Sequence, residues 1–307
     1  MSWISKLESQ GQITVALTHY NQAMTQIHTE QSFVEIARLL FNAMNKIQNE
    51  WVSTQTVFFD GDGKAFQTMI GEALSSMDSS CFISSEEVST LVYFEPLIMD
   101  HKVLTKNQYN PNQELKPELV RKAGRLHHKL LNAFKTYNSE RTDENTKRVI
   151  KRISELLYVV RSNIAHGEKT PYGPDLNKRE RDEHVCKGVV PVQLLLLDVL
   201  LDSPQKKLVV YGTLAPGNAN NQVLSDLHGT WEHCKINGIL SESGGYPFFE
   251  WIPSALSIDA QLFVSDDLPA HWDRLDHFEG PEYIRTLIPA SKNDGMCIAN
   301  VYEINRL

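Results

Sequence analysis

The chain has 307 residues, of which 22% are charged and 41% hydrophobic, as in an ordinary globular protein. This length predicts two domains and excludes one small disulfide-stabilised fold. The longest apolar run, at 194–201, contains Asp198 and is too short to cross a membrane. Lys6 and Glu8 argue against a secretory signal at the beginning of the chain. We therefore expect a cytoplasmic protein that does not enter a membrane.

The cysteines and histidines show no metal-binding spacing. The four cysteines lie far apart, and the eleven histidines include no His-Glu-x-x-His motif. The segment 60–63, Asp-Gly-Asp-Gly, is similar to the start of a calcium loop but lacks the later ligands, so we expect a turn there. We expect free thiols, no metal site and no cofactor.

The net charge of −8 is distributed unevenly. Residues 206–307 contain 7 basic and 13 acidic residues, whereas residues 116–152 contain 11 basic and 4 acidic residues. A local excess of positive charge can attract phosphate groups even in an acidic protein. Solvated helix faces would give the same pattern, so both interpretations stay open.

Helical periodicity dominates the first 201 residues. Apolar residues recur every three or four positions over 33–51, and Ser32 with Glu35 has the spacing of a capping box. Segment 53–115 is too irregular to assign. Three further helices are expected, the last interrupted near Gly188 and Pro191: 119–137, about 142–167 and about 178–201.

The pattern changes at residues 202–205, which we interpret as a linker. The segment 206–307 consists of short strand-like stretches separated by Gly, Pro and Asn, with one helix between 268 and 278. This pattern predicts a small mixed barrel or a strongly curled sheet. Six strands are expected, at 208–211, 231–236, 238–241, 256–264, 283–289 and 296–304.

Two segments of 206–307 contain candidate binding or catalytic residues. The first expected strand runs directly into a turn, which leaves the N–H groups of Gly212, Thr213 and Leu214 unpaired, and such a nest suits an anion. Glu279 ends the expected helix next to Gly280 and among apolar neighbours, so its pKa should be raised. Taken separately, an ordinary turn and a solvated surface carboxylate are the alternatives.

These segments resemble the gamma-glutamylcyclotransferase-like family, which includes the gamma-glutamylamine cyclotransferases. The resemblance rests on VYGTLAPG at 210–217, GTW at 229–231, GGYP at 244–247 and LDHFEGPEYIR at 275–285. It implies a mixed-strand barrel with one helix, whose cavity holds a gamma-glutamyl group. The turn formed by Tyr211, Gly212, Thr213 and Leu214 would bind the alpha-carboxylate of the substrate.

The resemblance also implies a reaction and a catalytic residue. The alpha-amine of the substrate attacks its own gamma-carbonyl, which releases an amine and gives 5-oxoproline. Glu279 matches the family's catalytic glutamate and would act as general acid and base, whereas Glu282 is a decoy. Tyr211 and Tyr283 are candidates to donate hydrogen bonds to substrate oxygen, or are packed aromatic rings. Binding without turnover stays open, and the sequence does not identify the amine.

A second candidate site lies in the helical domain, residues 1–201. Arg161 and His166 are five residues apart near the end of the expected helix 142–167. A strong cation beside an imidazole suits metal-independent cleavage of RNA by its 2′-hydroxyl group, although two cations at a helix end also stabilise the helix dipole. LYVVRSNIAHG at 157–167 resembles the Rx4-6H signature of the HEPN superfamily, with the convincing part at about 115–201.

The HEPN resemblance implies a homodimer whose paired motifs line one cleft. It also implies a ribonuclease or an RNA-binding effector, with the barrel as a small-molecule-binding or regulatory module. The sequence therefore predicts an all-helical HEPN-like domain followed by a gamma-glutamylcyclotransferase-like barrel. We rank cyclisation at Glu279 first and RNA cleavage or binding at Arg161 and His166 second. Whether the two domains are coupled stays open.

Overall fold

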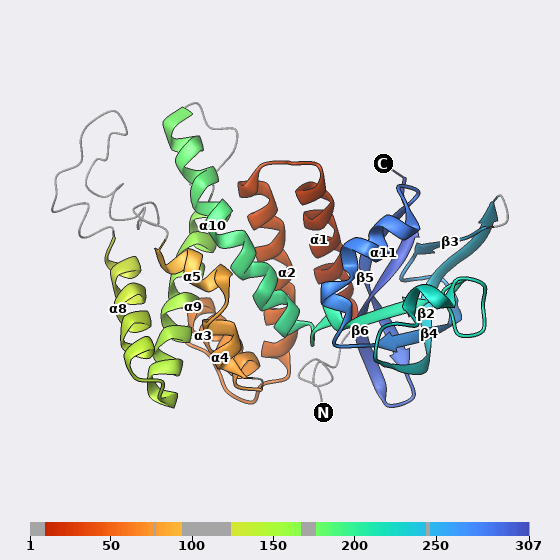
Figure 1. Ribbon diagram of the computed structural model, residues 1–307. Helices are drawn as coiled ribbons and strands as arrows, with labels where there is room; N and C mark the ends of the chain where they lie inside the picture. Colours follow the sequence, from red (N-terminus) through yellow and green to blue (C-terminus); the bar gives the residue numbers. More distant parts are fainter. Residues whose placement is uncertain (1–9, 77, 94–123, 167–175, 244–245, 307) are drawn as a thin grey trace. The chain divides into compact units, whose positions relative to one another are not determined.

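A computed structural model describes residues 10–76, 78–93, 124–166, 176–243 and 246–306 (Figure 1). The chain divides into two compact units. The helical unit is residues 22–199, and the β unit is residues 200–307 together with the residues up to Asn21. Within the described ranges, no helix is both long and apolar enough to span a membrane.

The longer helices are α1 (Gln10–His28), α2 (Phe33–Ser53), α3 (Asp62–Ser75), α4 (Ser79–Ile83), α5 (Glu86–Tyr93), α8 (Arg125–Ser139), α9 (Asp143–Ala165), α10 (Leu176–Leu200) and α11 (Trp272–Glu279). The strands are β1 (Lys207–Val210), β2 (Thr230–Ser243), β3 (Tyr246–Trp251), β4 (Ser257–Val264), β5 (Tyr283–Lys292) and β6 (Gly295–Ile304). Short 3-10 turns lie at Pro204–Lys206, Asn221–Leu224 and Leu268–Ala270.

Helix α9 is the central helix of the helical unit, because α2, α3, α4 and α8 all pack against it. Its N-terminus is capped by Thr142, whose hydroxyl accepts a hydrogen bond from the N–H of Asn145 at 3.3 Å. Its buried residues recur at helical spacing, so one stripe faces the core. They include Val149, Ile153, Leu156, Leu157, Val160 and Ile164.

The structure confirms the expected helix at 33–51, with Ser32 as its N-cap, and extends it to Ser53. Helix α8 lies within and just beyond the expected 119–137, of which residues up to 123 lie outside the described ranges. The expected interruption of the last helix is wrong, because α10 continues through Pro191. Proline costs about 3 kcal/mol in a helix interior. Burial of the flanking Val190 and Val192 offsets that cost.

The strands of the β unit form one six-stranded sheet in the order β3-β2-β4-β1-β6-β5. Strand β1 pairs with β6 in parallel and with β4 in antiparallel orientation. A further pairing of Lys235 on β2 with Ser291 on β5 closes the sheet into a small barrel. The mixed barrel with one helix predicted from the sequence is therefore present (Figure 1).

The expected strands at 231–236 and 238–241 are one strand, β2, and the strand β3 was missed. Gly238 does not end β2, because it lets β3 approach closely. A Cβ added at Gly238 would lie 2.3 Å from the ring of Phe249 and 2.4 Å from the carbonyl oxygen of Glu250. The glycine therefore marks a close strand contact, and β2 continues through Asn237, where we predicted a boundary between two strands.

Strand β1 is buried on both faces and thereby separates two apolar clusters. Val209 belongs to the cluster inside the barrel, whereas Leu208 and Val210 belong to a cluster that includes Leu275 of α11. Because β1 has no solvent-facing side, its register is fixed by packing. The end of β1, where the candidate turn begins, is thus held rigidly.

The β unit also includes a segment from far upstream. The side chain of Asn21 donates a hydrogen bond to the carbonyl of Leu287 at 2.9 Å and accepts one from the same residue's N–H at 2.8 Å. Leu287 lies on β5, at one end of the sheet order. The amide side chain therefore pairs with β5 in the way that a neighbouring strand would.

Candidate active site

A cavity of about 130 Å³ lies at the end of β1. The cavity is lined by all six residues that the sequence analysis selected in the β unit: Tyr211, Gly212, Thr213, Leu214, Glu279 and Tyr283. The other lining residues are Leu208, Val209, Val210, Asn220, Pro247, Phe278 and Tyr302. Residues of four strands, one helix and the loop after β1 therefore meet at a single cavity.

The turn after β1 presents backbone donors to this cavity. Among the described residues, no acceptor forms a hydrogen bond with the N–H groups of Gly212, Thr213 and Leu214. Gly212 is required by the opposite wall, since a Cβ there would lie 2.9 Å from Cγ of Pro247 on β3. Three unpaired amides next to a cavity form a site for an anion such as a carboxylate.

Glu279 is the last residue of α11, and the helix ends because Gly280 adopts a φ of +79°. Burial raises the pKa of the Glu279 carboxyl to about 7. The predicted direction is thus confirmed, but burial is the cause and the helix terminus is not. With this pKa the group exchanges protons near neutrality, as a general acid and base must. Glu282, by contrast, is exposed and does not line the cavity.

The two tyrosines form walls of the cavity. The hydroxyl of Tyr211 donates to the carbonyl of Tyr302 at 2.8 Å, and that of Tyr283 donates to the carbonyl of Pro247 at 3.1 Å. Burial raises the pKa of Tyr211, so its hydroxyl stays protonated. The Tyr283 ring stacks on Phe248 with centroids 5.2 Å apart. The phenol protons are therefore engaged by the protein, and donation to a substrate would require these bonds to open.

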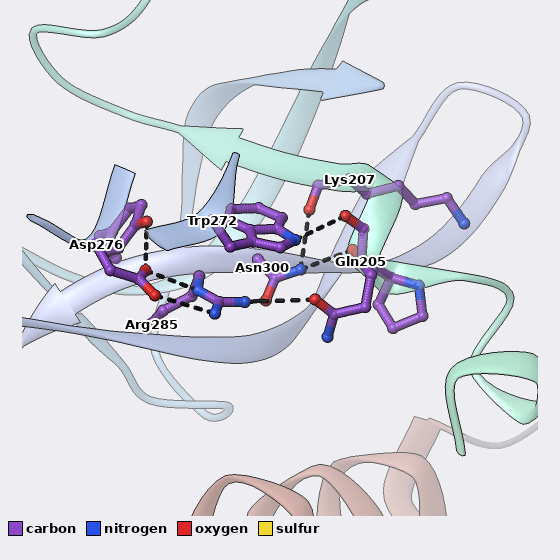
Figure 2. Close-up of polar contacts among 8 residues, drawn as sticks. Gln205, Lys207, Trp272, Asp276, Arg285 and Asn300 are labelled. Carbon is purple, nitrogen blue, oxygen red and sulfur yellow. Dashed lines mark hydrogen bonds and ion pairs between the residues drawn. The ribbon is translucent and has the colours of Figure 1, made fainter. Parts of the chain in front are cut away.

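A polar network behind the cavity holds α11 against the barrel, as Figure 2 shows. Arg285 on β5 forms a bidentate ion pair with the carboxylate of Asp276, with Nε–Oδ1 and Nη2–Oδ2 distances of 2.9 and 3.1 Å. The same carboxylate accepts a hydrogen bond of 2.6 Å from the hydroxyl of Tyr302, which lines the cavity. Asp276 lies one turn before Glu279 on α11, so the ion pair fixes the helix end that carries Glu279.

The network continues from Arg285 to the start of the β unit (Figure 2). The guanidinium lies 4.4 Å from the centre of the Trp272 ring and donates to the side chains of Gln205 and Asn300 at 3.4 and 3.3 Å. Trp272 in turn donates its indole N–H to the carbonyl of Gln205 at 3.0 Å. Arg285 thus connects α11, β5, β6 and the segment that precedes β1.

Arg161 and His166 have different surroundings in the helical unit. The Arg161 guanidinium is half-buried, 5.3 Å from the ring centre of Tyr158 and 5.9 Å from that of Phe66. Burial lowers the pKa of Arg161. No carboxylate among the described residues forms an ion pair with it. His166 is the exposed C-cap residue of α9.

Seven cavity residues were not selected as site residues from the sequence: Leu208, Val209, Val210, Asn220, Pro247, Phe278 and Tyr302. Pro247 and Phe278 stand within the motifs that carry the resemblance, so their positions were visible without their role. Tyr302 had no signal beyond its place in an apolar strand. Asn220 belongs to a run of three asparagines in four residues, which is the signal that could have identified it.

Residues 208–307 match the family described as gamma-glutamyl cyclotransferase, AIG2-like. This segment is therefore an AIG2-like domain, and the barrel agrees with that assignment. No curated protein matches the chain.

Part of the chain is similar to solved structures, including the following three. YkqA from Bacillus subtilis is 26% identical over 33% of this chain and 36% of its own, with a TM-score of 0.28. The uncharacterized protein PH0828 from Pyrococcus horikoshii is 20% identical over 32% of this chain and 76% of its own, with a TM-score of 0.25. An AIG2-like protein from Mus musculus is 20% identical over 33% and 78%, with a TM-score of 0.27. The chain thus spans about a third of the length of YkqA.

Proposed function

We propose that the barrel, with its domain boundary at about residue 206, cyclises a gamma-glutamyl amine or peptide to 5-oxoproline. One observation carries this proposal: the partly buried carboxylate of Glu279, with a pKa of about 7, lines the same cavity as three backbone N–H groups that lack an acceptor among the described residues. The N–H groups suit the alpha-carboxylate of a glutamyl group, and the carboxylate suits its amine. The AIG2-like match over 208–307 supports the same chemistry.

The proposed reaction needs no water and no external nucleophile. The substrate's alpha-ammonium gives a proton to the Glu279 carboxylate, and the neutral nitrogen then attacks the gamma-carbonyl carbon. Glu279 returns this proton to the leaving nitrogen as the carbon–nitrogen bond breaks. Ring closure frees a second proton from the attacking nitrogen, and Glu279 passes it to the released amine. The products are 5-oxoproline and an ammonium ion. Holding both ends of the glutamyl group favours the folded conformer that closes the ring.

The proposal is tested by incubating the purified full chain with gamma-glutamyl amines and measuring released 5-oxoproline. We expect release by the wild type and almost none by Glu279→Gln, which keeps the size but cannot exchange a proton. Glu282→Gln is the matched control, because this exposed residue lies three positions away. Release that persists in Glu279→Gln, or no release from any gamma-glutamyl amine, would contradict the proposal.

A second candidate function is RNA cleavage or RNA binding by a homodimer of the helical unit. The observation that favours it is the half-buried Arg161 guanidinium, which packs on two aromatic rings and, among the described residues, forms no direct ion pair, although Asp62 acts on it electrostatically. A desolvated cation of this kind attracts phosphate strongly. His166 would then supply the titrating group, and the basic segment 116–152 the attraction for RNA.

Metal-free incubation with single-stranded RNA tests this second function. We expect cleavage that is abolished in His166→Ala, or, for an RNA-binding effector, affinity that falls in Arg161→Lys. Exposed His128 is the matched control position, as His128→Ala should change neither. RNA that is neither cut nor bound would rule this function out.

A further inference from the structure

The three carbonyl groups of the candidate anion-binding turn are all held by the segment that follows it. Asn218 donates its side-chain N–H to the carbonyl of Gly212 at 2.9 Å, and Asn221 does the same for Leu214 at 2.8 Å. The carbonyl of Thr213 accepts the backbone N–H of Asn220 at 3.0 Å. Each C=O of residues 212–214 is therefore bonded, whereas each N–H of these residues lacks an acceptor among the described residues.

Peptide planarity links these two facts. In a trans peptide the C=O of one residue and the N–H of the next point in opposite directions. The bond from Asn218 to the Gly212 carbonyl therefore fixes the direction of the Thr213 N–H. The bond to the Thr213 carbonyl fixes that of Leu214 in the same way. The asparagine segment thus determines where two of the three free donors point, namely the N–H groups of Thr213 and Leu214.

The third carbonyl bond closes the turn itself. Asn221 holds the peptide between Leu214 and Ala215, and the N–H of Ala215 donates back to the Gly212 carbonyl at 3.1 Å. In addition, Asn220 donates its side-chain N–H to the hydroxyl of Thr213 at 3.1 Å. All three asparagines therefore bond the turn, and none is a spacer.

We propose that Asn218 and Asn221 are positioning residues that make this site selective for a ligand with a free alpha-carboxylate. Neither side chain lines the cavity, so both act through the turn. The inference rests on the proposed function, since it assigns the carboxylate of the glutamyl group to the turn. A relaxed turn would direct its N–H groups elsewhere and would lose affinity for the carboxylate but not for the rest of the ligand.

The test compares two ligands and two readouts on the full-length protein. Calorimetry measures binding of 5-oxoproline and of its carboxamide, and a release assay uses gamma-glutamyl amines with either a free or an amidated alpha-carboxyl. The variants are Asn218→Ala and Asn221→Ala. Gln222→Ala is the matched control, because this neighbouring amide is exposed and its side chain makes no hydrogen bond in the described part of the chain.

We expect each asparagine variant to weaken binding of 5-oxoproline by roughly threefold to tenfold, the effect of one hydrogen bond. The KM of the free-carboxyl substrate should rise by a similar factor. Binding of the carboxamide and turnover of the amidated substrate should stay within about twofold, and Gln222→Ala should match the wild type. The same variants should keep the wild-type melting temperature to within a few degrees.

Two results would overturn the inference. Equal losses for the acid and the amide would mean that the asparagines only maintain the cavity, and unchanged affinity for the acid would mean that they do not position the donors. The release assay separates this inference from the proposed function. If the variants selectively lose 5-oxoproline binding but no protein turns over substrate, the proposed function is contradicted and the inference is supported. If turnover is unaffected by both variants, the function is supported and the inference is contradicted. If the wild type neither binds nor turns over these compounds, both are contradicted.

Discussion

The two candidate sites differ in how the fold treats residues that the sequence singled out. In the β unit, Tyr211 and Glu279 are 68 positions apart, yet the closed barrel brings both to one cavity. In the helical unit, Arg161 and His166 are close in sequence, yet one packs on aromatic rings and the other caps an exposed helix end. Short spacing on a helix therefore does not make a site, whereas a closed sheet can make one from distant segments.

Removing the carboxylate of the barrel site should have the largest effect on activity. Glu279→Gln should lower kcat/KM for 5-oxoproline release by about 10² to 10⁴, the usual contribution of general acid–base catalysis. Steady-state kinetics with a gamma-glutamyl amine measures it. The exposed Glu282→Gln should stay within about twofold of the wild type. A loss of less than tenfold in Glu279→Gln would leave the barrel site no better supported than the helical one.

The pH dependence of the reaction sharpens the same point. Burial raises the pKa of Glu279 to about 7, and the proposed base is the ionised form. As pH falls from 7 to 5, log(kcat/KM) should therefore decline with a slope that approaches 1, or roughly 50-fold in total. A carboxylate with the ordinary pKa of about 4.3 would show almost no decline over this range. Kinetics at half-unit steps distinguishes the two profiles.

The network behind Glu279 should matter more than a surface ion pair on the same helix. Arg285→Met leaves Asp276, whose side chain is 36% exposed, without its cation and removes the packing of the guanidinium on Trp272, and should lower the free energy of unfolding by about 1–3 kcal/mol. Arg274→Met removes a pair with Asp226 whose side chains are 43% and 54% exposed, and should cost less than about 1 kcal/mol. Chemical denaturation measures both. Equal costs would show that the network does not support the barrel.

Gly238 tests whether the close contact of β2 and β3 is as tight as the geometry indicates. Gly238→Ala places a methyl group against the Phe249 ring and should destabilise the protein by about 1–3 kcal/mol. Gly71→Ala is the matched control, because an added Cβ there meets nothing within 4 Å and alanine favours the helix. Thermal melts should show a lower midpoint for the first variant alone. A Gly238→Ala midpoint equal to the wild type would mean that β3 adjusts freely.

The smallest expected effect concerns the helical site. His166→Ala should leave 5-oxoproline release within about twofold of the wild type, because His166 is not part of the barrel cavity. The release assay with saturating substrate measures this directly. A large loss would mean that the two candidate sites depend on each other, and the contrast between them would no longer hold.

The sequence predicted the parts of the fold that follow from local rules. The capped helix at 33–53 was visible because Ser32 and an apolar stripe act within a few residues. Strand β3 was missed because its position depends on the cross-strand contact at Gly238, which no local pattern reports. Burial likewise carried α10 through Pro191, against the local preference of proline. The errors therefore occurred where packing decides and local propensity does not.

The candidate site divides in the same way. The turn and Glu279 stand within motifs, so their residues could be selected from the sequence. Apolar neighbours of Glu279 were one of the two causes that we expected for its raised pKa, but the extent of burial depends on how α11 packs on the barrel and could not be predicted. The roles of Asn218 and Asn221 also depend on a loop folding back on itself. No periodic pattern reports that fold-back.

The hydrogen bonds between Asn21 and Leu287 have a practical consequence for anyone who wishes to excise the barrel. A fragment that starts at residue 206 would lack this side chain and leave both main-chain groups of Leu287 open to solvent. Unsatisfied strand edges promote association between molecules. Such a fragment should aggregate more readily than the same fragment with a substitution on β5 that prevents pairing with another strand.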